Sequence, residues 1–284
     1  MQNQTIQRRS VLIVLVCFLS TLSFMLKGEE ADKILFGKYL QKMQNSAVKD
    51  RGEVMAQTAL FFLETPYVAK TLEREPEQLV VNLHELDCMT FVESVLALSE
   101  TILSPSPSWD TFLAKLKSIR YRKGEIVDYT SRLHYTSDWI FDNERRGNVQ
   151  DVTQSIGGKP LPIAVSFMST HPDSYKQLAN HPEWITVMAE KEKEINGRSY
   201  FYIPQEEIPH CADKIQTGDI VCFVTAIKGL DISHVGIIYN TEGKQTFIHA
   251  SSTKKKVIVN EAPLSTYVSS IKNTIGIMII RPRF

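Results

Sequence analysis

The chain lacks any excess of charge, is poor in cysteine and contains no repeats. Its 284 residues include 32 lysines and arginines against 32 aspartates and glutamates, and this balance gives no indication of a nucleic-acid partner. Four cysteines are too few for a small scaffold held together by disulfide bonds. The absence of repeats and low-complexity tracts argues against a repeat protein or a largely disordered chain. By contrast, 43% of the residues are apolar, which is ample for a substantial folded core.

A long apolar run occurs only near the N-terminus. It extends from Val11 to Leu26 and follows the basic residues Arg8 and Arg9. A basic segment followed by an apolar stretch too short for a comfortable membrane span is typical of a secretory signal peptide. No small-x-small cleavage pattern stands near Gly28, so an uncleaved membrane anchor is the alternative. We therefore expect residues 1–28 to be a signal peptide or an N-terminal anchor.

The periodic patterns place helices first and strands afterwards. Apolar residues three and four apart predict helices at 31–44, at 52–64, from Cys88 onward, from Trp109 to about Tyr121, and between Pro172 and Ile195 with a break near 180–182. A strand is predicted from Leu161 to Met168. From Ser199 the period changes to two, which predicts strands at 199–203, 219–226, 233–239, 245–250, 256–259 and 274–281, with a short helix between Pro263 and Ile271.

This order favours an α+β fold in which an antiparallel sheet packs against the helix that begins at Cys88. No long flexible linker separates the two halves, so residues 29–284 are expected to form a single domain. The interval 124–147 has no clean period and is rich in aromatic and basic side chains. Such a segment can be a binding surface, or it can simply pack over the core.

Cys88 stands where a helix is predicted to begin, with Asp87 in the N-cap position. A cysteine becomes a nucleophile as its thiolate, which a helix N-terminus and a neighbouring imidazole can stabilise. His234, at the head of a predicted strand, could supply that imidazole. The alternative is that Cys88 is a small buried apolar residue, which is the commoner role of a free cysteine. Asp87 is expected to cap the helix rather than to act as an acid.

A second histidine is predicted to lie close to His234. The strands on either side of Asn240-Thr241-Glu242-Gly243 could form a hairpin, and if Tyr239 opposes Lys244, then His234 lies directly across from His249. Directly opposed residues have Cβ atoms about 5 Å apart, close enough for the two rings to share a hydrogen bond. The prediction depends on the assumed loop length, because a change of register moves the pairing.

Other histidines and a metal site are also considered. His84, His134 and His210 are alternative bases that spacing does not exclude. His84 and Cys88 are four residues apart, but the helix is predicted to begin only near Cys88, and no paired Cys/His spacing typical of zinc sites is present. We therefore expect no metal.

The cysteine count is odd once the N-terminal segment, which contains Cys17, is set aside. Cys88, Cys211 and Cys222 remain, so at least one thiol is expected to be unpaired. Cys211 and Cys222 could form a disulfide bond, or all three could be reduced, because sequence does not show whether the geometry allows a bridge.

Five short motifs follow one another along the chain. They are Thr65-Pro66-Tyr67-Val68, Asp87-Cys88-Met89-Thr90-Phe91-Val92, Gly218-Asp219-Ile220-Val221, Ser233-His234-Val235-Gly236-Ile237 and Phe247-Ile248-His249-Ala250-Ser251. In these motifs and their order the chain resembles the NlpC-type superfamily of papain-like cysteine peptidases and amidases, which act on bacterial peptidoglycan. The resemblance covers most of the chain after the N-terminal segment. It implies a papain-like (NlpC-type) α+β fold, with N-terminal helices packed on a C-terminal antiparallel β-sheet or barrel.

The resemblance also implies roles for individual residues. Cys88 corresponds to the nucleophile, His234 to the base, and His249 to the polar residue on the next strand that orients the base. Tyr67 corresponds to a tyrosine that lies at the active site in the superfamily. Catalysis of this kind needs no cofactor.

The chain departs from the common pattern in two places. The usual Asp-Cys-Ser-Gly-Phe is replaced by Asp87-Cys88-Met89-Thr90-Phe91, and an insertion occupies about residues 122–150. In these features it is similar to the N-acetylmuramoyl-L-alanine amidase-like branch, which implies cleavage between the lactyl group of the sugar and L-alanine. Candidate oxyanion or substrate-binding residues are Tyr67 and, in the insertion, Tyr129, Ser131, Arg132, His134 and Trp139. Arg132 could bind a stem-peptide carboxylate or form a structural ion pair.

The resemblance thus leads us to expect an exported cysteine amidase in the periplasm or cell envelope of a bacterium. Its partner would be peptidoglycan or a muropeptide, it could be tethered to a membrane through the N-terminus, and we expect a monomer. Within the same class, an endopeptidase that cuts the γ-D-glutamyl–diamino acid bond is the alternative, and an acyl transferase would use the same residues. A non-catalytic wall-binding relative is an alternative of another class.

Overall fold

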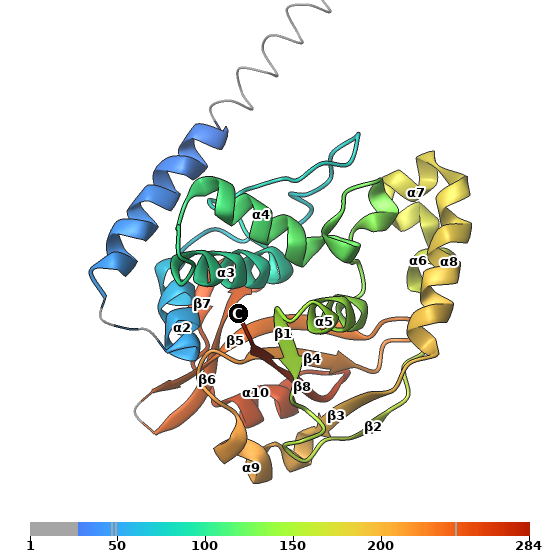
Figure 1. Cartoon of the computed structure of the whole chain (residues 1–284). Coiled ribbons are helices and arrows are strands. Elements are labelled where there is room, and N and C mark those ends of the chain that lie inside the picture. Colours follow the sequence, from blue (N-terminus) through green and yellow to red (C-terminus); the bar gives the residue numbers. More distant parts are fainter. Residues whose placement is uncertain (1–27, 47, 49, 242) are drawn as a thin grey trace, which may run out of the picture.

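The structure is a computed structural model that describes residues 28–46, 48, 50–241 and 243–284 (Figure 1). The predicted signal peptide or anchor therefore lies outside the described residues, apart from Gly28. Among the residues that are described, no helix is both long and apolar enough to cross a membrane.

The first part of the described chain is helical, as predicted. Residues 28–44 are helical, and α2 (Arg51–Phe61), α3 (Cys88–Ile102) and α4 (Trp109–Arg120) follow. Each of these three labelled helices begins at a polar cap, because the side chains of Asp50, Asp87 and Ser108 accept a hydrogen bond from a backbone N–H of the first turn. The predicted start of α3 at Cys88 is confirmed.

The last part forms an antiparallel sheet. Its strands are β1 (Val149–Asp151), β2 (Lys159–Leu161), β3 (Tyr200–Pro204), β4 (Ile220–Thr225), β5 (Ile232–Thr241), β6 (Lys244–Ser251), β7 (Lys256–Val259) and β8 (Thr274–Pro282). They are arranged in the order β2-β3-β8-β4-β5-β6-β7, with β1 also paired to β8. The strands β3 to β8 and the short helix α10 (Leu264–Ser270) confirm the predicted strands and helix to within about two residues.

The middle of the chain differs most from the prediction. The strand predicted from Leu161 to Met168 is wrong, because β2 ends at Leu161 and the chain enters α6 (Phe167–Thr170). Pro162 follows directly and has no N–H to continue a ladder. The apolar run reflects burial instead, since Val165 and Met168 are almost fully buried without forming a strand. The break predicted near 180–182 is confirmed, with α7 (Lys176–Asn180) ending just before Pro182 starts α8 (Pro182–Asn196).

The insertion is more ordered than its sequence suggested. It contains η1 (Arg122–Gly124), η2 (Tyr129–Ser131), α5 (Thr136–Arg145) and β1. The remaining short helices are η3 (Pro172–Ser174), η4 (Gln205–Glu207), α9 (Ile208–Cys211) and η5 (Ala212–Lys214).

Both faces of the sheet are buried, and the alternation along β4 shows how. Ile220, Cys222 and Val224 lie in the larger core, which also contains residues of α2, α3 and α4. Val221 and Phe223 point to the opposite face and lie in a smaller core with residues of α10. In Figure 1, α3 lies on one side of the sheet and α10 on the other. The predicted α+β architecture, with helices packed on a C-terminal antiparallel sheet, is confirmed.

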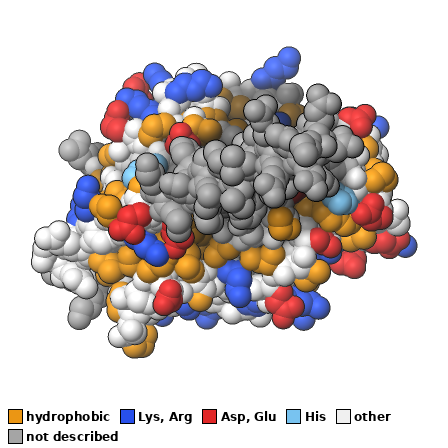
Figure 2. Space-filling view, turned by 90° about the horizontal axis from the view of Figure 1, so that it is seen from above, with side chains coloured by type: hydrophobic (Ala, Val, Ile, Leu, Met, Phe, Trp, Pro, Cys, Tyr) orange, Lys and Arg blue, Asp and Glu red, His pale blue; other side chains and the backbone are white. Residues whose placement is uncertain are grey.

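The surface agrees with the neutral composition. On the face shown in Figure 2, basic and acidic side chains are interspersed wherever the side chains can be seen. The part of that face that is visible carries no large patch of a single charge, consistent with the balance of 32 and 32.

Candidate active site

Cys88 is the first residue of α3, and a reciprocal pair of hydrogen bonds fixes the start of that helix. The carboxylate of Asp87 accepts from the backbone N–H of Thr90 at 2.8 Å, and the Thr90 hydroxyl accepts from the backbone N–H of Asp87 at 2.9 Å. This is a capping box, which satisfies two N–H groups that the helix leaves free. The predicted role of Asp87 as a helix cap is confirmed.

The thiol of Cys88 lies at the junction between α3 and β5. The backbone N–H groups of Val235, Met89 and Cys88 itself favour the charged form of the sulfur. Burial has the larger effect and, together with the neighbouring charge of Asp87, raises the pKa of Cys88 to about 12. The residue as a whole is nevertheless partly exposed. The resting site therefore holds a neutral thiol, whereas the sequence led us to expect a thiolate.

His234 and His249 are in direct contact. Nε2 of His234 lies 2.6 Å from Nδ1 of His249, and the two rings meet edge to face with their centroids 4.8 Å apart. Burial lowers the pKa of His234 to about 4. Burial and the charge of His234 lower the pKa of His249 to about 3. Both rings are therefore neutral at pH 7, joined by one hydrogen bond in which one nitrogen donates and the other accepts.

The contact between the two histidines does not arise from the predicted register. Thr241 pairs with Lys244, so the connection is two residues shorter than assumed and His234 lies diagonal to His249 rather than opposite it. Diagonal neighbours are farther apart, but long side chains still reach across. Gly236 makes room for this approach, because a Cβ there would lie 3.3 Å from the Cβ of His249 and 2.9 Å from the backbone of β6. The predicted pairing is wrong, while the predicted contact between the rings is present.

An aromatic group that the sequence analysis missed surrounds the two histidines. The ring centroid of Phe223 lies 5.7 Å from that of His234, and the centroid of Phe247 lies 4.7 Å from that of His249. Tyr267 of α10 packs against both phenylalanines and lies 6.0 Å from His249. No sequence motif pointed to Tyr267, because α10 reaches β5 and β6, the strands that carry the histidines, only by packing in the folded protein.

The backbone of Tyr67 lies beside the residues that lead into Cys88. Its segment pairs with the residues just before the cysteine, since Val68 donates its N–H to Leu86 and Leu86 donates to Pro66. Burial raises the pKa of Tyr67, and the nearby charge of Cys88 adds to the effect. The phenol is therefore neutral and able to donate a hydrogen bond.

Arg132 lies in a structural ion-pair network of the insertion. Its guanidinium is almost fully buried, with Nη1 3.2 Å from Glu73 and Nη2 3.2 Å from Glu77. It also stacks over the ring of Tyr129, at 4.9 Å from the centroid. Both acidic partners belong to the irregular segment 69–86, which leads directly into Cys88. Of the two roles that the sequence allowed for Arg132, this geometry matches the structural ion pair.

Two other candidate binding residues of the insertion, Ser131 and His134, have polar side-chain atoms engaged locally. Ser131 donates its hydroxyl to the carbonyl of Asp128, and Nε2 of His134 lies 2.8 Å from the carbonyl of Tyr129. Burial lowers the pKa of His134 to about 3. Trp139 belongs to the apolar core on α5. Among the described residues, these side chains contact the insertion and the elements packed against it rather than Cys88.

The alternative bases lie in other surroundings. His84 is exposed and lies 3.9 Å from the carboxylate of Asp32. His210, on α9, is also exposed and lies 3.2 Å from the carboxylate of Glu207. The three cysteines of the described chain, Cys88, Cys211 and Cys222, are all free. Among the residues that the structure describes, no group of three or more His, Cys, Asp or Glu side chains could hold a metal ion.

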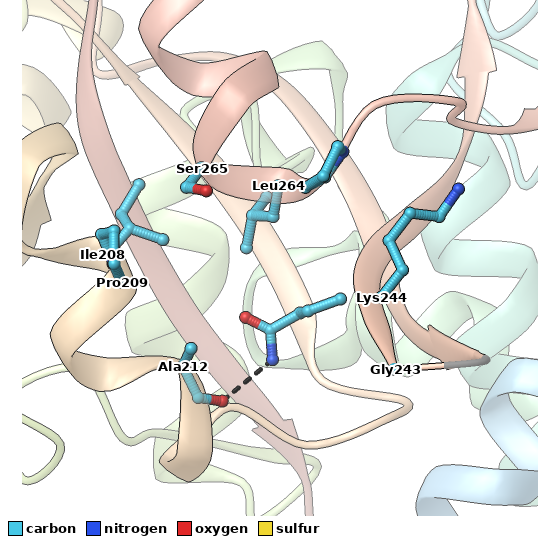
Figure 3. A pocket seen from close by; sticks show the side chains of 9 residues that line it. Ile208, Pro209, Ala212, Gly243, Lys244, Leu264 and Ser265 are labelled. Carbon is cyan, nitrogen blue, oxygen red and sulfur yellow. Dashed lines mark hydrogen bonds between the residues drawn. The ribbon is translucent and has the colours of Figure 1, made fainter.

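Two surface cavities lie apart from the histidine pair. The larger, of about 360 Å³, is lined by residues of α9, β6 and α10 (Figure 3). In its wall the side-chain amide of Gln245 donates a hydrogen bond to the carbonyl of Ala212. The smaller, of about 290 Å³, lies in the insertion and is lined by Ser131, Arg122 and Lys191 among others. Neither is lined by Cys88, His234 or His249.

Comparison with known proteins identifies relatives over most of the chain. The model of a family described as AmiA-like, N-acetylmuramoyl-L-alanine amidase-like, matches residues 57–277. The crystal structure of an N-acetylmuramoyl-L-alanine amidase from Bacteroides uniformis is 41% identical, covers 82% of this chain and 99% of its own, and has a TM-score of 0.79. A Bacteroides fragilis protein provisionally named a xylanase is 40% identical, covers 80% of this chain and 99% of its own, and has a TM-score of 0.76. Among curated proteins, none matches.

A more distant structure shares the fold. A protein from Legionella pneumophila is 24% identical, covers 91% of this chain and 96% of its own, and has a TM-score of 0.69. The family match extends from α2 into β8 and includes Cys88, His234 and His249. The chain therefore belongs to the AmiA-like, N-acetylmuramoyl-L-alanine amidase-like family.

Proposed function

We propose that this protein is an exported cysteine amidase that cleaves the N-acetylmuramoyl-L-alanine bond of peptidoglycan or muropeptides. The observation that carries the proposal is the hydrogen-bonded pair of His234 and His249 on strands that pack against α3, the helix that begins at Cys88. Membership of an amidase-like family supports the bond assignment. The basic and apolar N-terminal segment supports export.

The histidine contact dictates which nitrogen would serve the thiol. Because Nε2 of His234 is engaged with His249, Nδ1 is the nitrogen left for Cys88. Nδ1 can accept a proton only in the tautomer that carries its hydrogen on Nε2. That hydrogen is then donated to Nδ1 of His249, which would fix both the ring orientation and the tautomer of His234.

Bond cleavage would proceed through a thioester. The Cys88 thiol gives its proton to Nδ1 of His234 as the sulfur attacks the lactyl carbonyl carbon, and His234 then protonates the departing amine of L-alanine. The muramoyl lactyl group remains on Cys88 until a water molecule, activated by His234, hydrolyses the thioester. Backbone N–H groups at the start of α3 would stabilise the negative oxygen in both steps, with Tyr67 as a further donor.

The test is hydrolysis of a defined muropeptide by the wild type and by Cys88→Ala. The wild type is expected to release a free peptide that begins with L-alanine, and Cys88→Ala to lose this activity by at least about 10³-fold because no other group can form the acyl-enzyme. Cys211→Ala is the matched control, since that cysteine is also free but lies on α9. Undiminished release by Cys88→Ala would refute the proposal.

The endopeptidase alternative predicts different products. Cleavage of the γ-D-glutamyl–diamino acid bond would leave L-alanine attached to the sugar, so mass spectrometry of the products separates the two activities. A wall-binding protein without catalysis would bind the muropeptide and leave it intact.

The xylanase name of one relative does not fit the chemistry of this site. Glycoside hydrolases generally use two carboxyl groups roughly 5–9 Å apart. The carboxylate next to Cys88 belongs to Asp87, and the helix cap engages it. Hydrolysis of xylan is therefore not expected.

A further inference from the structure

Tyr267 on α10 has a placement that neither the motifs nor the proposed mechanism uses. Its ring packs against Phe223 at 5.4 Å and Phe247 at 4.9 Å, between centroids. The same two phenylalanines pack against His234 and His249. Tyr267 therefore completes the aromatic surroundings of the histidine pair, from an element that enters the site only through tertiary packing.

The ring of Tyr267 also touches the orienting histidine directly. Its centroid lies 6.0 Å from that of His249 with the planes at 68°, an edge-to-face arrangement. Removal of this ring would leave space beside His249, and buried side chains move into such space only partly. One function of the ring is thus to hold His249 in place against His234.

The hydroxyl of Tyr267 is available to a ligand. Tyr267 is partly exposed, and among the described residues no side chain or backbone group hydrogen-bonds its phenol. Burial raises the pKa of Tyr267, so the phenol is neutral at pH 7.

We propose that Tyr267 is a substrate-contacting residue of the amidase, whose ring positions His249 and whose hydroxyl binds a polar group of the muropeptide next to the histidine pair. This inference rests on the proposed function and adds a residue to it. A neutral phenol can donate to a carbonyl or accept from an N–H, and both are abundant in the lactyl-peptide part of a muropeptide.

Two substitutions separate the contributions of the ring and the hydroxyl. Tyr267→Phe keeps the ring, so KM for the muropeptide is expected to rise roughly three- to tenfold, the value of one neutral hydrogen bond, with kcat within about twofold. Tyr267→Leu removes the ring as well, so kcat should also fall by about tenfold or more because His249 is no longer held. Tyr202→Phe on β3 is the matched control and should behave like the wild type.

A binding experiment keeps this inference separate from the proposed function. In full-length Cys88→Ala protein, Tyr267→Phe should weaken the Kd for the same muropeptide by the same three- to tenfold. Unchanged KM and Kd in the Tyr267→Phe variants would overturn the inference while leaving the amidase intact. A wild-type protein that binds the muropeptide without cleaving it would refute the proposed amidase activity. The change in Kd between the Cys88→Ala proteins with and without Tyr267→Phe would still decide the role of the Tyr267 hydroxyl. Absence of binding by Cys88→Ala would overturn the inference.

Discussion

The thiol and the imidazole are both neutral in the resting protein, and this sets the proposed chemistry. Burial raises the pKa of Cys88 to about 12 and lowers that of His234 to about 4. A preformed ion pair is therefore unfavourable before substrate binds. Proton transfer from sulfur to nitrogen is then expected to accompany attack on the carbonyl, as in a serine–histidine pair.

The pH dependence of the proposed amidase activity should reveal the low pKa of His234, the proposed base. The base works only when its ring is neutral, and a lowered pKa keeps it neutral until the pH falls to about 4. We expect kcat/KM at pH 5 to be about nine-tenths of its plateau and to be lost below pH 4. A pH–rate profile measured on a neutral muropeptide analogue checks this, and an acid limb near pH 6.5 would contradict it.

Asp87 affects the thiol through its charge and the helix through its hydrogen bonds, and one substitution separates the two. Asp87→Asn keeps a good cap, so the free energy of unfolding should change by less than about 1 kcal/mol. Loss of the negative charge should lower the pKa of Cys88 and speed its alkylation by iodoacetamide a few-fold at pH 8. Asp50→Asn, at the cap of α2, is the control. Equal alkylation rates in the two variants would disprove the charge effect.

At the scale of elements, the insertion supports the segment that leads into the candidate active site. Arg132 of the insertion pairs with Glu73 and Glu77 of segment 69–86, and Arg120 of α4 donates to the carbonyl of Val80 in the same segment. Glu77 also accepts from Tyr121. These bonds tie the irregular segment to α4 and to the insertion, and they restrain the chain that leads to Cys88.

Loss of Arg132 should therefore destabilise the fold more than it weakens substrate binding. Arg132→Met leaves the buried carboxylate of Glu77 without its cation, and we expect a loss of about 3–5 kcal/mol in the free energy of unfolding. Adding Glu77→Gln to Arg132→Met should recover part of the lost free energy of unfolding. Lys256→Met, which breaks an exposed pair with Glu64, should cost less than about 1 kcal/mol. Urea unfolding measures all three, and a raised KM at unchanged stability would instead favour carboxylate binding by Arg132.

Element boundaries were predictable where the local pattern matched the packing. Asp87 and Thr90 encode the start of α3 by themselves, and the strands from β3 to β8 show a clear period of two. The hairpin register was not predictable, because the side-chain pattern is unchanged by a slip of two residues. The packing of Gly236 against β6 selects the observed register and brings His249 onto His234.

At the scale of the whole molecule, the chain order of helices and strands brings distant segments to one site. Cys88 comes from the helical half, and His234 and His249 come from the sheet. The site exists only where α3 packs against β5 and β6, so the catalytic proposal depends on the complete α+β core.

Export of the whole protein is testable by fractionation. When the full chain is produced in a Gram-negative bacterium, we expect it in the envelope fraction, because the segment from Arg8 to Leu26 has the pattern of an export signal. The mass of the mature protein distinguishes cleavage near residue 28 from an uncleaved anchor. Recovery of the intact chain in the cytoplasm, while a variant with a proven signal peptide is exported, would contradict the prediction.

The sequence by itself determined the fold class, the helix cap at Asp87 and the candidate residues Cys88, His234 and His249, because caps, periodicity and motifs are local in the chain. The tertiary structure decided the diagonal contact of the two histidines, the neutral state of the thiol, the structural pairing of Arg132 and the approach of Tyr267. These depend on burial and on contacts between residues far apart in the sequence, which no local pattern encodes.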